Sequence, residues 1–142
     1  MNKLLVAIAL TVASISSAFA DERPYTDGSV WDLSMIRTTD GMGDTYLESL
    51  QKNYKPVLDE AKKQGLILSY KIIGTTNSGP DDWDLLLMVE YKNWAALDGL
   101  SEKFEAIQRK IISKKDENKL MESRLQVRRF VGSKNGQEII LK

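Results

Sequence analysis

The side chains best suited to chemistry in this sequence are polar and aromatic residues on segments that otherwise look like buried strands. Burying an unpaired polar group costs about 1–3 kcal/mol in proteins, so such a residue either belongs to a site or sits at a strand end. Asp32, Arg37, Lys71 and Glu90 are polar residues of this kind. Some of them, grouped with aromatic side chains, would form a pocket for a small apolar or aromatic ligand. The predicted pocket residues are Trp31, Arg37, Tyr54, Tyr70 and Trp83.

A structural role is the favoured explanation for any one of these residues taken alone. Charged side chains at strand ends stay in water or pair across a subunit interface, and aromatic side chains commonly fill a core. The sequence therefore predicts that only a subset of the candidates lines a pocket.

Two charged segments are weaker candidates for binding sites. The acidic segment 81–84 offers carboxylate oxygens for a hard cation but lacks the spaced ligands and the glycine of a calcium loop, so a turn is favoured. A basic run near the C-terminus could bind an anion, but acidic residues lie just upstream and favour a solvated surface of mixed charge. The basic run consists of Arg124, Arg128, Arg129 and Lys134.

The amino-acid composition argues against several kinds of functional site. The chain has 142 residues with no histidine and no cysteine, so it lacks the usual general base, the commonest metal ligand and any disulfide. We therefore expect no metal ion and no cofactor. Its 20 lysine and arginine residues are balanced by 20 aspartate and glutamate residues, which predicts no basic face for nucleic acid or for an anionic membrane.

The first twenty residues have the pattern of a secretory signal peptide. Lys3 precedes an apolar run at residues 4–10, and small residues follow as far as the cleavage motif Ala18-Phe19-Ala20. The apolar run is far shorter than the ~20 residues that span a bilayer, so no membrane association is expected after cleavage. Export would place this protein in a bacterial periplasm or outside the cell. The predicted segments are a signal peptide (1–20), a flexible N-terminal lead (21–29) and a single domain (30–142).

Hydrophobic periodicity predicts four strands and two main helices in the domain. Their order is strand, helix, strand, strand, helix, strand, which is the arrangement of a ferredoxin-like α+β fold with both helices on one face of an antiparallel sheet. The predicted elements are strand 30–37, helix 45–64 with Leu47, Leu50, Tyr54, Leu58 and Ala61 on its apolar face, strands 66–76 and 83–91, a helical region from the cap residue Asn93 to Ile111, and a short C-terminal strand.

Local signals add detail to the first helix and to the C-terminal region. Thr45-x-x-Glu48 has the spacing of a capping box, and Pro56 should kink the helix that follows. Residues 113–124 are highly charged and are expected to be helical or irregular. Asn135-Gly136 either precedes the last strand or forms the turn of a hairpin.

The segment WDLLLMVEYKNW, residues 83–94, predicts a partner for the sheet. In the middle of this strand Leu86 and Met88 make the second face apolar as well as the first. Helices cover one face only, and an apolar face is unstable in water at about 25 cal/mol per Å2. We therefore expect a homodimer in which two sheets pair face to face and close into a barrel.

The element order and the segment YLESLQKNYKPVLDEAKKQGLILSYKI resemble the dimeric α/β-barrel superfamily, which includes the antibiotic-biosynthesis monooxygenases, the EthD-like proteins and the NIPSNAP proteins. In several of these families the helix carries a His-x-Pro step, and here Tyr54-Lys55-Pro56 occupies the matching position. The resemblance implies a dimeric barrel. The haem-degrading relatives use a histidine iron ligand, which this chain does not contain.

Three functions fit these observations. The favoured one is an exported dimeric barrel that binds a small apolar or aromatic ligand. The second is a cofactor-independent oxygenase or isomerase acting on a small aromatic substrate, with Tyr54 and an aspartate or arginine as its polar groups. The third is a structural interaction module, which predicts an interior filled by side chains.

Overall fold

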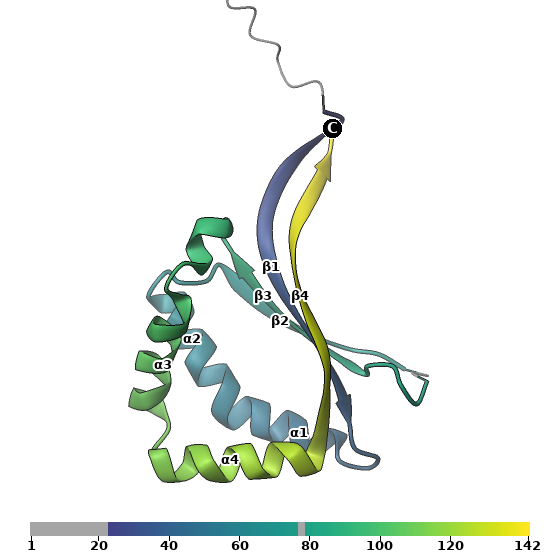
Figure 1. Ribbon diagram of the computed structural model, residues 1–142, viewed down its shortest axis with the longest axis vertical. Coiled ribbons are helices and arrows are strands. Elements are labelled where there is room, and N and C mark those ends of the chain that lie inside the picture. The colour runs from purple at the N-terminus through teal and green to yellow at the C-terminus, as the bar shows by residue number, and fades with distance from the viewer. Residues whose placement is uncertain (1–22, 77–78) are drawn as a thin grey trace, which may run out of the picture.

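Residues 23–76 and 79–142 are described by the computed structural model, and within them four strands form one antiparallel sheet in the order β2-β3-β1-β4. Helices cover one face of this sheet (Figure 1). The order of the elements confirms the predicted ferredoxin-like α+β fold. The strands are β1 (Tyr25–Thr38), β2 (Ser69–Gly74), β3 (Leu85–Tyr91) and β4 (Arg128–Leu141). The helical elements are α1 (Gly43–Ser49), the π-helical turn η1 (Leu50–Tyr54), α2 (Lys55–Lys63), the 3-10 turn η2 (Trp94–Leu97), α3 (Leu100–Ile111) and α4 (Lys114–Val127).

The first strand starts earlier than predicted. The signal peptide lies outside the described residues, but residues 25–29, assigned to a flexible lead, belong to β1 and pair with the end of β4. The partner strand ends in Ile139, Ile140 and Leu141, and this long-range pairing overrides the local turn signals of Pro24 and Gly28. The prediction of a flexible lead is therefore wrong for residues 25–29.

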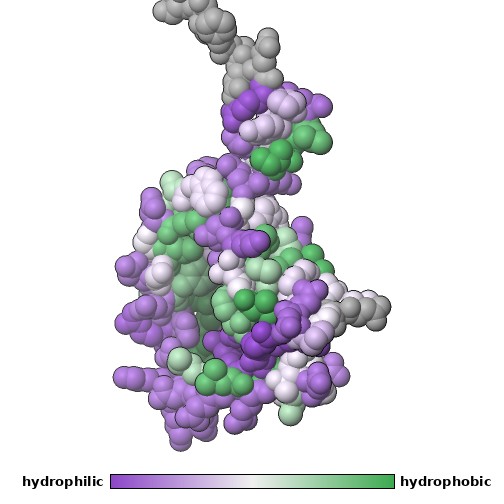
Figure 2. Space-filling view, turned by 45° about the vertical axis from the view of Figure 1, so that its right-hand side comes forward, coloured by the Kyte–Doolittle hydropathy of each residue, from purple (hydrophilic) through white to green (hydrophobic). Residues whose placement is uncertain are grey.

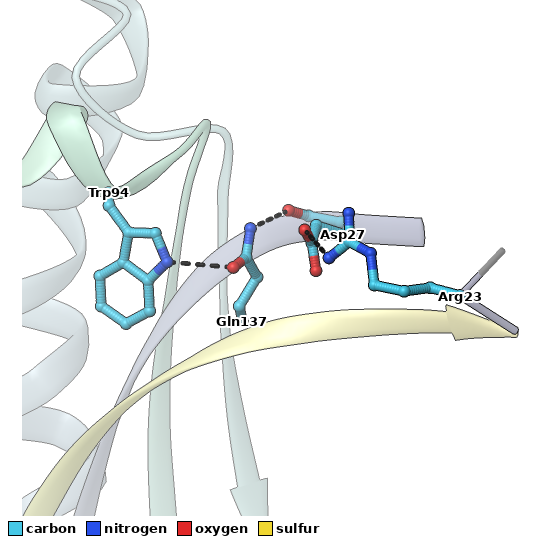
Figure 3. A network of polar contacts seen from close by, with 5 residues as sticks. Arg23, Asp27, Trp94 and Gln137 are labelled. Carbon is cyan, nitrogen blue, oxygen red and sulfur yellow. Dashed lines mark hydrogen bonds and ion pairs between the residues drawn. The ribbon is translucent and has the colours of Figure 1, made fainter. Parts of the chain in front are cut away.

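The ends of β1 and β4 form an arm that extends past the other two strands (Figure 1). We call residues 25–29 and 137–141 the β1–β4 arm. At its base the Trp94 indole Nε1 donates a hydrogen bond to Gln137 Oε1 over 3.1 Å, and Gln137 Nε2 donates to the Gly28 carbonyl over 3.3 Å (Figure 3). Glu138 packs so closely on Gly28 that a Cβ there would lie 2.7 Å from a carboxylate oxygen. The Trp94 bond ties the arm to η2, and the other two contacts hold its two strands together.

The first helical segment contains a π-helical turn where a proline kink was predicted. Pro56 lies in the first turn of α2, directly after η1. Proline has no N–H to donate to the carbonyl four residues earlier, which favours a widened turn at this point. Gly65 ends the segment with a φ of 72°, as predicted. The predicted capping box is wrong, because α1 begins at Gly43 and its cap residue Met42 makes no side-chain capping bond.

The C-terminal region is a helix followed by one long strand. Ser113 caps α4 by accepting a hydrogen bond from the backbone N–H of Asp116 over 3.2 Å. The hairpin alternative is wrong, because Asn135 and Gly136 lie inside β4 and pair with Asp32 and Trp31. The β1 partner strand holds β4 extended through the turn signal.

The core lies between the sheet and the helices. On β3 every second side chain is buried under the helices, and the side chains between them point to the other face. Among the described residues, no helix is long and apolar enough to cross a membrane. The buried β3 residues are Leu85, Leu87, Val89 and Tyr91, and they pack with Val30, Ile36, Leu58, Ala61 and Ile107 from the other elements.

Candidate functional site

A cavity of about 300 Å3 lies between the sheet and the helical layer. Figure 2 shows a hollow in this part of the molecule, with apolar side chains inside it. The size is at the lower end of the range for small-molecule sites, roughly 300–1,000 Å3. The apolar part of the lining comes from Ile36, Leu50, Val57, Leu58, Leu87, Phe104, Ile112 and Phe130. The polar part includes Ser34, Tyr46, Asn53, Tyr54, Gln108, Arg124 and Arg128.

The π-helical turn determines which side chains of the first helical segment reach the cavity. Leu50, Asn53 and Tyr54 all line it from this one turn. The amide of Asn53 donates a hydrogen bond to the Ser49 carbonyl over 3.1 Å, which holds its side chain along the turn. A wider turn takes up one more residue, so the buried position in α1 is Tyr46 rather than the predicted Leu47, which is 41% exposed.

Tyr54, Asp32 and Tyr91 form a group of titratable side chains on the helix-covered side. Burial raises the pKa of Tyr54 strongly, and the nearby Asp32 carboxylate raises it further. The same two causes raise the pKa of Tyr91 to about 12. Burial also raises the pKa of Asp32, opposed by the hydrogen bond that Ser34 Oγ donates over 3.3 Å. At neutral pH Tyr54 is therefore a neutral phenol, able to donate a hydrogen bond to a ligand but unable to act as a base.

Two arginines give part of the cavity wall a positive charge. Arg124 near the end of α4 and Arg128 at the start of β4 both line the cavity. The Arg128 guanidinium lies over the Tyr46 ring, with Cζ 5.6 Å from the ring centroid. Burial raises the pKa of Tyr46, and the charges of Arg128 and Arg124 oppose that increase. Within the part of the chain that the structure describes, neither arginine forms an ion pair with a carboxylate.

The basic run does not form one mixed-charge surface, as was favoured, because it divides between the two sides of the sheet. Arg124 and Arg128 line the cavity, whereas Arg129 lies outside it, 4.0 Å from the Asp81 carboxylate. Lys134 pairs with Leu33 on the face of the sheet without helices. The sequence could not predict this division, because the spatial position of Arg128 depends on where α4 ends and β4 begins.

The structure does not bring the five predicted pocket residues together. Tyr54 lines the cavity, but Trp31 and Arg37 lie on the opposite face of β1, where the Lys71 ammonium is 5.2 Å from the Trp31 ring centroid. Tyr70 on β2 donates a hydrogen bond from its hydroxyl to Asp59 over 2.7 Å. Trp83 precedes β3 next to Asp82. Sequence reasoning missed Tyr46, Asn53 and Gln108.

The acidic residues do not assemble a metal site. Among residues 23–76 and 79–142, no group of three or more acidic side chains could hold a metal ion. In segment 81–84, Asp84 accepts hydrogen bonds from Thr38, including one of 2.9 Å from its backbone N–H. This contact ties the start of β3 to the end of β1, as expected for a residue at a strand edge.

Comparison with known proteins supports the fold. The sequence matches no protein-family model, and no curated protein matches it significantly. A dimeric ferredoxin-like protein from an uncultured marine organism superimposes with a TM-score of 0.50 and 15% identity, over 82% of this chain and 90% of that one. HapK from Hahella chejuensis matches with a TM-score of 0.45 and 12% identity, over 77% of this chain and 91% of that one. The chain is thus similar in fold to a ferredoxin-like protein of distant sequence.

Proposed function

We propose that this protein binds a small apolar or aromatic ligand in the cavity between the sheet and the helices. The observation that carries the proposal is the cavity itself, with its volume of about 300 Å3, apolar walls and few polar groups. Such a combination is typical of small-molecule sites, in which apolar walls supply affinity and isolated polar groups set orientation. A purely structural module would have filled this space with side chains.

Binding fits the site better than the enzymatic alternative does. An oxygenase or isomerase that removes a proton from its substrate needs a base in contact with that substrate. Of the described residues that line the cavity, none is a carboxylate, and the Tyr54 phenol is protonated at neutral pH. Asp32 influences Tyr54 but does not line the cavity. The cavity is therefore suited to holding a molecule rather than to deprotonating it.

A titration with a neutral aromatic alcohol tests the binding proposal. We expect 2-naphthalenemethanol to cause saturable shifts in the amide resonances of Leu50, Leu87 and Phe104 in two-dimensional NMR spectra of the 15N-labelled protein. Leu87→Trp should remove these shifts by filling the cavity, whereas Leu125→Trp, at a position 84% exposed on α4, should not. The proposal is wrong if neither this alcohol nor its acidic analogue 2-naphthoate shifts the cavity amides.

We further propose that a second copy of the chain covers the face of the sheet that has no helices. This free face carries Trp31, Leu33 and Met35 of β1, Leu86 and Met88 of β3, and Ile73 of β2. It also carries charges of both signs, with Lys71 and Lys134 against Glu90, so a copy related by a two-fold axis can pair them. The arm supports the same arrangement, because Ile139, Ile140 and Leu141 expose apolar surface where β1 and β4 extend past the other two strands. The ferredoxin-like protein of similar fold is itself dimeric.

Export is the third part of the proposal. The apolar run and the Ala-x-Ala motif in residues 1–20 support cleavage before Asp21, which would deliver the protein to a bacterial periplasm or to the medium. The intact mass of the protein purified from the periplasm of an expressing bacterium checks this. A mass that includes residues 1–20 would contradict it.

A further inference from the structure

We infer that the ligand is an amphipathic anion, with an apolar or aromatic body and one acidic group held by Arg128 and Arg124. This inference rests on the proposed function and adds the chemical class of the ligand. It depends on the positively charged part of the cavity wall, which apolar binding alone does not require.

The first observation is an unsatisfied donor on one of the residues that line the cavity. The Nε of Arg128 is buried and has no hydrogen-bond partner, and it is the one such side-chain atom among the described residues. A buried donor on a charged group is unfavourable when unpaired, so its retention points to a partner that the chain does not supply. A planar guanidinium presents several N–H groups in a fixed geometry that matches a carboxylate.

The second observation is the absence of a neutralising carboxylate from the described residues around the two arginines. Asp116, Glu117 and Glu122 on α4 are near in sequence, but none forms an ion pair with Arg124 or Arg128. Glu117 instead accepts a hydrogen bond from the Gln108 amide over 3.2 Å. Two cations at one site without a counter-ion repel each other, and a bound anion would remove that repulsion.

The third observation concerns the position of the arginine. Arg128 is held over the ring of Tyr46, which is itself buried in the core. A cation–π contact of this kind limits the freedom of the guanidinium before any ligand arrives. Leu50, Leu87 and Phe104 line the same cavity, so an acidic group at Arg128 would leave the apolar body of the ligand among them.

The affinities of 2-naphthoate and 2-naphthalenemethanol test the inference, because the two compounds share one ring system and differ in the acidic group. We expect the wild-type protein to bind 2-naphthoate about 10-fold more tightly, as follows from one charged hydrogen-bonded contact. Arg128→Met should remove this preference, so that the ratio of the two affinities falls to about one. Arg128→Lys should keep part of the preference, because it retains the charge but not the planar arrangement of donors.

Arg129→Met is the matched control, because this neighbouring arginine lies outside the cavity. It should leave the preference for 2-naphthoate intact. If Arg128→Met fails to fold, Arg124→Met provides the second test and should reduce the preference. Equal affinities for the two compounds in the wild-type protein would overturn the inference but not the proposed function, and so would a preference that survives both arginine substitutions. Failure of both compounds to bind would overturn the proposed function.

Discussion

The two faces of the sheet use the same strands in different ways. On the helix-covered face, Tyr54, Tyr91 and Asp32 are removed from water, and burial raises the pKa of each. On the free face, the Ser69 hydroxyl donates to Glu90 and lowers the pKa of that carboxyl group. The alternation of side chains along a strand thus separates a desolvated cavity from a charged, partly apolar contact surface. A polar residue on a strand therefore indicates a binding site or a contact surface only when the face of the sheet on which it lies is known.

The largest effect is expected from a charge placed in the middle of the free face. Met88→Lys should convert the proposed dimer to a monomer at micromolar concentration, because a second lysine beside Lys71 would be buried without a partner in the interface. Light scattering coupled to size-exclusion chromatography measures the change. Met121→Lys on α4, at a position 62% exposed, should leave the mass unchanged. A monomeric wild-type protein would contradict the proposed role of the free face.

The next largest effect is a difference in the free energy of unfolding between substitutions of two neighbouring leucines on β3. Leu87→Ala should reduce the free energy of unfolding by about 2–4 kcal/mol, because this side chain is buried under the helices. Leu86→Ala should cost about 1 kcal/mol within one subunit, because Leu86 is partly exposed on the other face. Urea unfolding of both proteins, in a background that is monomeric, measures the difference. Equal losses would remove the distinction between the two faces.

A smaller change in the free energy of unfolding, of opposite sign, is expected from substitution of Arg128 in the cavity wall. Arg128→Met should raise the free energy of unfolding by about 1 kcal/mol in the absence of ligand, because it removes a buried donor that has no partner. Arg129→Met should have little effect on stability, because Arg129 is more than half exposed. Thermal unfolding of the ligand-free proteins measures both. Marked destabilisation by Arg128→Met would show that the arginine has a structural role instead.

The smallest effect should depend on pH. Burial raises the pKa of Asp32 in the folded protein above its value in the unfolded chain, so its ionised form reduces stability at neutral pH. Asp32→Asn should therefore stabilise the protein at pH 7 by about 0.5 kcal/mol, a figure that allows for the partial exposure of the group. The gain should disappear as the pH falls below the pKa of the unfolded chain, where both forms are neutral. A gain that is constant from pH 3 to pH 7 would contradict this explanation.

Much of the fold could be predicted from the sequence, because hydrophobic periodicity along each segment reports which face is buried. The order of elements and the alternation of Trp31, Leu33 and Met35 against Asp32 and Ser34 follow from that pattern. The starting residue of β1 could not be predicted, because residues 25–29 become a strand only through pairing with residues 137–141. Local propensity contains no information about such a distant partner.

Less of the site could be predicted. Tyr54 was identified because it lies on an apolar helical face, but Tyr46 was missed because a 3.6-residue repeat extended through a π-helical turn points to Leu47. Arg124 and Arg128 were separated from Arg129 only by the change from α4 to β4. Tyr46 and the two arginines were misplaced at points where the backbone departs from a regular helical repeat, which is the pattern on which the prediction depends.

The π-helical turn also preserves the composition of the cavity, because it absorbs one residue within the first helical segment. A π-helical turn contains about one residue more than an α-helical turn. Deleting exposed Lys52 would allow an ordinary α-helix to run through this point without a break in the chain. The helix before the deletion would keep its rotation relative to α2, because the wide turn already takes up the extra residue. Tyr46 would then stay next to Arg128, whereas an ordinary α-helix through the full-length sequence would rotate Tyr46 away from it by about 100°.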